Sequence, residues 1–132
     1  MAKPAITTSA ISGSIETQNK KRPKLTAGHT EEQQKYIDYA WDISHDENFI
    51  YLLKAENGAL SPTTASKGVN KNGYRDVGLC QINMGYHKKI VNDPRFTDYK
   101  WQLEQCLRLY RNGTKFYAKK NIWKVKKFFI WE

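Results

Sequence analysis

The sequence contains no apolar run of the roughly 18 residues that a membrane-spanning helix needs. Its first segment, residues 1–14, also lacks the compact apolar stretch of a secretory signal. We therefore expect neither a transmembrane segment nor a recognisable leader. If the chain acts outside the cytoplasm, it is exported by another route, or this sequence is a mature form.

Cysteine is scarce, because the chain has only Cys80 and Cys106. Two cysteines are too few for the disulfide framework of a small secreted domain. We expect two buried thiols in a reducing compartment, with a single disulfide as the alternative. His45 and His87 have no His or Cys at the spacing of a metal site, so the sequence predicts no metal and no cofactor.

Acidic residues are also in deficit, with 13 against 22 Lys and Arg, which gives a formal net charge of +9. Such a surface attracts polyanions over a Debye length. Nucleic acid, an anionic membrane and the bacterial cell wall are all polyanions, and the net charge alone does not distinguish among them. A chain of 132 residues with 39% hydrophobic residues suits one domain with its own core.

The chain divides into an arm and a folded domain. Residues 1–28 are rich in Thr, Ser, Lys and Pro and show little periodicity, which predicts a flexible basic arm. Its basic cluster, residues 20–24, is interpreted as a solvated linker; nuclear import or a contact with nucleic acid or phosphate is the alternative. Residues 29–132 form the predicted domain.

Two capping motifs predict the first helices. Residues 30–33, Thr-Glu-Glu-Gln, fit a capping box that begins a helix ending near Ile43. Residues 44–47, Ser-His-Asp-Glu, fit a second box, and its helix should cover about residues 45–56. Gly58 stands where a helix ends with a left-handed residue.

The middle of the chain changes character. Asn72-Gly73 is a tight-turn signal, and residues 74–83 alternate enough to form a strand. We predict a small β-hairpin within residues 60–80. Thr97 or Asp98 caps a helix over about residues 98–112, and Gly113 closes it. One or two short helices follow in residues 116–131. For the tryptophans, core packing is expected rather than sugar stacking: Trp101, Trp123 and Trp131.

Glu56 is the most informative single residue. It follows Phe49, Leu52 and Leu53 by seven, four and three positions, so the four side chains share one helix face. A carboxyl group that continues an apolar stripe at a helix C-terminus should have a raised pKa, because burial and the macrodipole both disfavour the anion. Such a group can donate a proton to a leaving-group oxygen. The alternative is a helix-end Glu turned to solvent.

Asp76 supplies a second carboxylate, twenty residues after Glu56 and on the predicted strand. A helix-end Glu that faces a strand Asp across a cleft is the arrangement that glycoside hydrolysis uses. The alternative is that Asp76 pairs with one of the neighbouring basic residues: Lys67, Lys71 or Arg75.

These residues resemble the lysozyme superfamily, which includes animal-type lysozymes and soluble lytic transglycosylases. Residues 56–58 read Glu-Asn-Gly, and residues 76–83 read Asp-Val-Gly-Leu-Cys-Gln-Ile-Asn. In the family, a helix-ending Glu is followed about twenty residues later by a Gly-Leu-x-Gln-Ile block. The resemblance covers roughly residues 36–123, with its core at 49–83. It implies a mainly α, α+β lysozyme-like fold with a small β-hairpin beside an active-site cleft.

The resemblance also implies an enzyme that cleaves peptidoglycan at the β-1,4 bond between N-acetylmuramic acid and N-acetylglucosamine. Glu56 would act as the catalytic acid, and Asp76 would stabilise the anomeric carbon or attack it. Transglycosylases commonly lack the second acid, so Asp76 favours hydrolysis. The enzyme would act on the cell wall, in the periplasm, outside the cell or from a virion.

Four further residues are predicted to bind the substrate. Gln81 would hold sugar or backbone groups, with bracing of the hairpin as the alternative. Gly78 would let the strand bend or the sugar approach closely. Asn57 stands where the family usually has Ser and can still form a hydrogen bond. Tyr117 lies in a Phe-Tyr-Ala stretch that poorly matches the transglycosylase Tyr-Asn-Ala-Gly; the alternative is a core aromatic. Cys80 is expected to pack.

Two other classes of function remain open from the sequence. The charge, residues 20–24 and the basic aromatic C-terminus also fit a nucleic-acid-binding module. The arm fits a structural or virion protein that keeps the fold without turnover and docks into an assembly. The small size, the arm and the missing export signal together favour a phage-borne wall enzyme.

Overall fold

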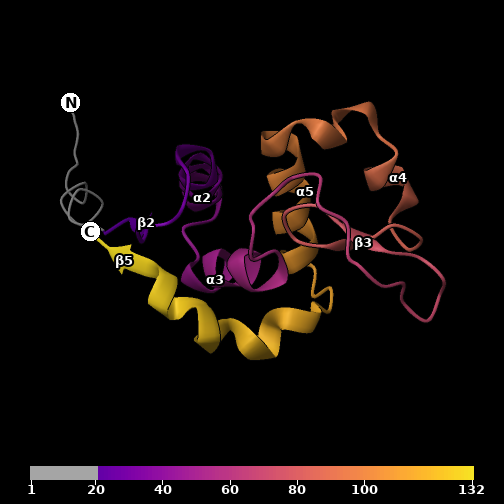
Figure 1. Cartoon of the computed structure of the whole chain (residues 1–132). Coiled ribbons are helices and arrows are strands. Elements are labelled where there is room, and N and C mark those ends of the chain that lie inside the picture. The colour runs from indigo at the N-terminus through magenta and orange to yellow at the C-terminus, as the bar shows by residue number, and fades with distance from the viewer. Residues whose placement is uncertain (1–20) are drawn as a thin grey trace.

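The computed structural model describes residues 21–132, which fold as a mainly helical α+β domain (Figure 1). The predicted fold class is confirmed at this level. Most of the predicted arm, residues 1–20, lies outside the described residues. In chain order the elements are β2 (Pro23–Leu25), α2 (Glu31–Ser44), α3 (Glu47–Glu56), β3 (Asp76–Val77), β4 (Ile82–Asn83), α4 (Lys88–Val91), the 3-10 helix η1 (Pro94–Thr97), α5 (Tyr99–Arg111), the 3-10 helix η2 (Tyr117–Phe128) and β5 (Phe129–Trp131).

The start of α2 confirms the first predicted capping box. Thr30 Oγ1 accepts a hydrogen bond from the Gln33 amide at 3.0 Å, and Gln33 Oε1 accepts one from the Thr30 amide at 2.7 Å. Both backbone donors would otherwise lack a partner at the helix end. The helix ends at Ser44, and His45 follows in the left-handed conformation with φ 46°.

The second predicted cap is wrong by two residues. Asp46, not Ser44, caps α3, because its carboxylate accepts a hydrogen bond from the Phe49 amide at 3.0 Å. The Ser44 hydroxyl instead donates back to Ala40 O at 2.7 Å within α2. The left-handed His45 separates the two helices, so α3 begins at Glu47.

Helix α3 is the central helix of the domain. Phe49, Ile50, Leu52 and Leu53 are each at most 1% exposed, so α3 is buried on more than one face. Its neighbours include α2 and η2, and η2 runs alongside it (Figure 1). The predicted left-handed end at Gly58 is not observed, because the positive φ of this loop falls on Leu60. The core thus fixes the helix whose last residue is Glu56.

Part of the predicted β-hairpin lies within residues 60–80, and its second strand pair extends beyond them to Asn83. Strand β3 pairs antiparallel with β4, and Ala65 adds an isolated bridge to Val77. The single predicted strand over 74–83 is wrong, because Gly78 (φ 87°) and Gln81 (φ 53°) reverse the chain in its middle. The predicted tight turn does form, with Gly73 at φ 83°, but it lies in the loop before β3.

Part of the predicted arm belongs to the fold. Strand β2 pairs antiparallel with β5, so that Pro23 lies opposite Trp131 and Leu25 opposite Phe129. The Trp131 indole packs against Trp41 at 5.2 Å between ring centroids, which anchors β5 on the core. The folded domain therefore starts before residue 29. Local strand propensity could not predict this pairing, because a three-residue strand is stabilised by a partner at the far end of the chain.

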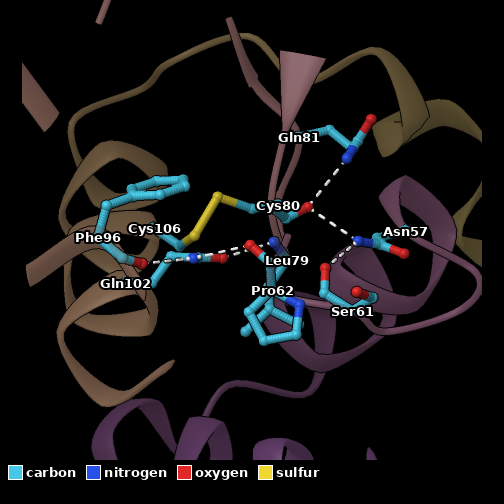
Figure 2. The surroundings of a disulfide bond; sticks show 10 residues. Asn57, Ser61, Pro62, Leu79, Cys80, Gln81, Phe96, Gln102 and Cys106 are labelled. Carbon is cyan, nitrogen blue, oxygen red and sulfur yellow. Dashed lines mark hydrogen bonds between the residues drawn. A yellow bond between two sulfur atoms is a disulfide. The ribbon is translucent and has the colours of Figure 1, made fainter. Parts of the chain in front are cut away.

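A disulfide joins Cys80 to Cys106, so the prediction of two free thiols is wrong (Figure 2). Both cysteines are fully buried, as predicted. Their partnership was not visible in the sequence, because α5 is brought to the 78–81 turn only by the tertiary fold. The bridge fixes the β3–β4 turn to α5.

Helix α5 confirms the predicted cap at Asp98, whose carboxylate accepts a hydrogen bond from the Lys100 amide at 3.0 Å. The chain then leaves α5 through Gly113 (φ 82°) and continues into η2. Trp123 on η2 is 65% exposed, so its predicted place in the core is wrong. Within residues 21–132, no helix is both long and apolar enough to cross a membrane.

Candidate functional site

A cavity of about 1000 Å³ lies beside the C-terminal end of α3. Its walls come from Glu56, from residues 70–76 before and in β3, from residues 81–87 around β4, and from residues 109–120 between α5 and η2. Segments far apart in the chain therefore converge on the last residue of the central helix. A volume of this size is typical of ligand-binding clefts.

Glu56 lies in this wall with a strongly perturbed carboxyl group. The pKa of Glu56 is raised to about 7, chiefly by burial and to a smaller extent by the nearby negative charge of Asp76. One hydrogen bond opposes this shift, because the Ala118 amide donates to Glu56 Oε2 at 3.0 Å. Burial outweighs this hydrogen bond. Because the resulting pKa is about 7, a large part of the Glu56 side chains carries a proton at neutral pH.

The two oxygens of Glu56 have different surroundings. Oε2 is held by the Ala118 amide, which fixes the orientation of the carboxyl group. Among residues 21–132, no protein group forms a hydrogen bond with Oε1. The proton therefore resides best on Oε1, because a backbone N–H needs an acceptor on Oε2. Oε1 is the oxygen able to give a proton to a bound molecule.

Asp76 is part of the same wall. Its backbone belongs to β3, opposite Asn83 of β4, and its Oδ1 accepts a hydrogen bond from Asn70 Nδ2 at 2.8 Å. None of the ion pairs among residues 21–132 includes Asp76, which removes the alternative of a simple salt bridge. Arg75 instead donates to the backbone oxygens of Ser66 and Lys67.

Gln81 also lines the cavity, and it braces the hairpin at the same time. Its Nε2 donates to Thr64 O and to Gly78 O, each at 3.0 Å. Its Oε1 has no hydrogen-bond partner among the described residues. The two alternatives are thus compatible, since the amide nitrogen holds the turn and the amide oxygen is left for a ligand.

Asn57 and Gly78 differ from their predicted places, because neither lines the cavity. Asn57 is only 4% exposed, and its Nδ2 donates to Ser61 O at 2.7 Å and Gly78 O at 2.9 Å (Figure 2). A Cβ on Gly78 would lie 2.6 Å from Gln102 Oε1, and its φ is 87°. Both residues shape the hairpin and its contact with α3, rather than contact a ligand.

Tyr117 is 78% exposed and lines the cavity, so the alternative of a core aromatic is excluded. It directly precedes Ala118, whose amide holds Glu56. The Phe-Tyr-Ala stretch, residues 116–118, therefore reaches the C-terminal end of α3. Its contribution is a backbone donor and one exposed aromatic face.

Several residues of the site were missed from the sequence. The role of the Ala118 amide could not be predicted, because a backbone N–H donor does not depend on the type of residue that carries it. The asparagines were visible only as a polar, turn-rich stretch, yet Asn72 and Asn83 bond to each other at 2.9 Å in the cavity wall. Within the described part of the chain, no group of three His, Cys, Asp or Glu is arranged to hold a metal ion.

Comparison of the chain with protein-family models, with curated proteins and with solved structures finds no match.

Proposed function

We propose that this chain is a peptidoglycan-cleaving glycosidase with a lysozyme-like catalytic domain. One observation carries the proposal: a carboxyl group with a pKa of about 7, Glu56, lies beside a second carboxylate, Asp76, in the wall of a cavity of about 1000 Å³. Paired carboxyl groups of unequal proton affinity are what glycosidic bond cleavage requires.

The proposed reaction begins with proton transfer from Glu56 Oε1 to the bridging oxygen of the glycosidic bond. The bond between that oxygen and the anomeric carbon breaks, and the leaving sugar departs as an alcohol. Asp76 stabilises the positive charge that develops on the anomeric carbon, or forms a bond to it. Glu56, now ionised, takes a proton from water as the water oxygen bonds to the anomeric carbon.

The polar lining supports a glycan that bears acetamido groups. Amide side chains offer both donors and acceptors, and four of them line the cavity: Asn70, Asn72, Gln81 and Asn83. Tyr86 and Tyr117, exposed by 77% and 78%, add aromatic faces on which sugar rings can pack. Alternating N-acetylmuramic acid and N-acetylglucosamine present these groups, and the β-1,4 bond between them is the proposed target.

The disulfide supports an enzyme that works outside the cytoplasm. Disulfides persist in oxidising compartments and are rare where glutathione keeps thiols reduced. We therefore place the activity at the cell wall. A phage-borne or virion-associated context, with docking through the N-terminal arm, is part of the same proposal.

The test is digestion of purified peptidoglycan followed by mass spectrometry of the fragments. We expect new reducing N-acetylmuramic acid ends, because Asp76 favours attack by water over internal attack. If 1,6-anhydro ends form instead, the bond cleaved is the proposed one, but the O6 hydroxyl of the sugar is the nucleophile. If no new ends of either kind form, the proposed function is wrong.

The rate of cleavage should depend on pH with an alkaline limit set by Glu56. Since one proton on Glu56 is needed, kcat/KM should fall about tenfold per pH unit above pH 7. Asp76→Asn removes the negative charge that raises the pKa of Glu56, so the residual activity of this variant should decline at a lower pH. A profile measured on labelled glycan that is flat from pH 6 to 9 contradicts the role of Glu56.

A further inference from the structure

The C-terminal quarter of the chain has an unusual charge pattern. Between Glu104 and Glu132 the sequence has no acidic residue, yet it contains Arg108, Arg111 and the following lysines: Lys115, Lys119, Lys120, Lys124, Lys126 and Lys127. This segment covers the end of α5 and all of η2, which runs alongside α3 and leads into β5 (Figure 1). The first residues of η2 line the cavity. The basic surface is therefore continuous with the candidate active site.

Three of these lysines reach the cavity itself. Lys115, Lys119 and Lys120 line it from the η2 side, and Lys71 lines it from the loop before β3. All four residues are exposed, and none belongs to an ion pair among residues 21–132. The carboxyl groups in the wall are only Glu56 and Asp76, so the cavity is positively charged.

A neutral glycan strand does not need this charge. Like charges held around one cavity repel each other, and an anionic ligand removes that repulsion while gaining charge-assisted hydrogen bonds. In peptidoglycan, the anions nearest the scissile bond are the carboxylates of the stem peptide, which is attached to N-acetylmuramic acid. Lysine suits this task, because its flexible side chain follows carboxylates of variable position.

We propose that the η2 side of the cavity, formed by Lys115, Lys119 and Lys120, is a subsite for stem-peptide carboxylates. The preferred substrate is then a glycan strand whose stem peptides carry free carboxylates, and a strand whose stem peptides are uncharged is a poorer one. This inference rests on the proposed function, and it names the substrate class that the same site selects.

The experiment compares two substrates and two matched double variants. The substrates are solubilised peptide-bearing glycan strands and the same strands after carbodiimide coupling with ammonia has converted the stem-peptide carboxylates into neutral amides. Lys119→Gln/Lys120→Gln removes two charges from the cavity wall. Lys124→Gln/Lys127→Gln removes two charges from the same helix, at residues that do not line the cavity. Circular dichroism and urea unfolding check that both variants fold.

The wild-type protein should cleave the strands with free stem-peptide carboxylates with a kcat/KM about tenfold above that for the amidated strands, as two exposed charge contacts would give. In Lys119→Gln/Lys120→Gln this ratio should fall towards one, mainly through KM. In the control variant the ratio should stay at the wild-type value. Added salt should reduce the wild-type ratio, because exposed charges are screened.

Three outcomes overturn the inference. Equal cleavage of both substrates by the wild type removes the subsite but leaves the proposed function intact. If the ratio of the two kcat/KM values drops equally in both variants, the preference comes from the general positive charge of the helix and not from a subsite. If Lys119→Gln/Lys120→Gln binds a fluorescent DNA duplex more weakly than the wild type while the ratio of the two kcat/KM values is unchanged, the surface is a nucleic-acid site. Failure of the wild type to cleave either substrate is different, since it refutes the proposed function itself.

Discussion

Glu56→Gln is expected to lower kcat for glycan cleavage by about 10²- to 10⁴-fold, the contribution that a positioned general acid makes. Gln keeps the shape of the side chain and can still accept the Ala118 N–H on its amide oxygen. It cannot release a proton to the departing sugar oxygen or later take one from water. Release of labelled fragments from peptidoglycan, followed over hours, measures the residual rate.

The control for this variant is its stability. In the folded wild type the pKa of Glu56 is raised from 4.5 to about 7, so the native state holds a proton that the unfolded chain has lost between these pH values. Wild-type stability therefore falls as pH rises through this window. In Glu56→Gln the side chain does not titrate, so its free energy of unfolding lacks this pH dependence. Measured by urea unfolding, the variant should become more stable relative to the wild type as pH rises from 4.5 to 7.

A matched substitution lies at the other end of the same helix. Glu47→Gln changes a carboxylate in the first turn of α3, far from the cavity lining, and should leave activity near the wild-type level. If Glu56→Gln cleaves glycan at more than about a tenth of the wild-type rate, another group is the acid, since general acids contribute at least 10²-fold.

Gln102→Leu is expected to destabilise the domain by about 3–5 kcal/mol, because it leaves buried backbone groups without partners. The side chain is fully buried. Its Oε1 accepts from the Leu79 amide at 2.7 Å, and its Nε2 donates to Phe96 O at 2.8 Å and Pro62 O at 3.1 Å (Figure 2). Leu fills a similar volume but satisfies none of the three. Urea unfolding with a fitted midpoint measures the change.

Gln105→Leu, three residues later on α5, provides the comparison. Its side chain bonds only to Arg108 at the surface, so its loss should change stability by no more than about 0.5 kcal/mol. A Gln102→Leu variant within 1 kcal/mol of the wild type would mean that the hairpin relaxes to satisfy its own amides. Activity adds a second measurement, because the same hairpin carries Asp76 and Gln81.

The parts of the fold that depend on neighbours in the chain could be predicted. The Thr30 capping box and the Asp98 cap follow from a few adjacent residues, and both are present. The apolar stripe at three, four and seven residues before Glu56 likewise indicated a part-buried carboxyl group, and burial is the largest cause of its raised pKa. Even the error at Ser44 was local, since a neighbouring Asp competed for the same role and formed the cap.

The parts that depend on distant segments could not be predicted. Cys80 and Cys106 were predicted as two thiols, because the sequence does not show that the fold packs α5 beside the hairpin turn. The Ala118 amide lies 62 residues from Glu56 in the sequence, and no side chain indicates that the two groups form a hydrogen bond. Asn57 directly follows Glu56 in the sequence, but its side-chain amide is used inside the protein, where it donates to Ser61 O and Gly78 O.

The pairing of β2 with β5 places the two ends of the described domain at one point on its surface (Figure 1). Arg22 and Glu132 exchange backbone hydrogen bonds of 2.6 and 3.0 Å, so any polypeptide attached before the first or after the second leaves from the same spot. The domain can therefore be attached to the end of a larger protein or inserted into one of its loops, and neither attachment would pull the folded domain apart. A tether at this point leaves the opening of the cavity unobstructed, because neither Arg22 nor Glu132 lines it.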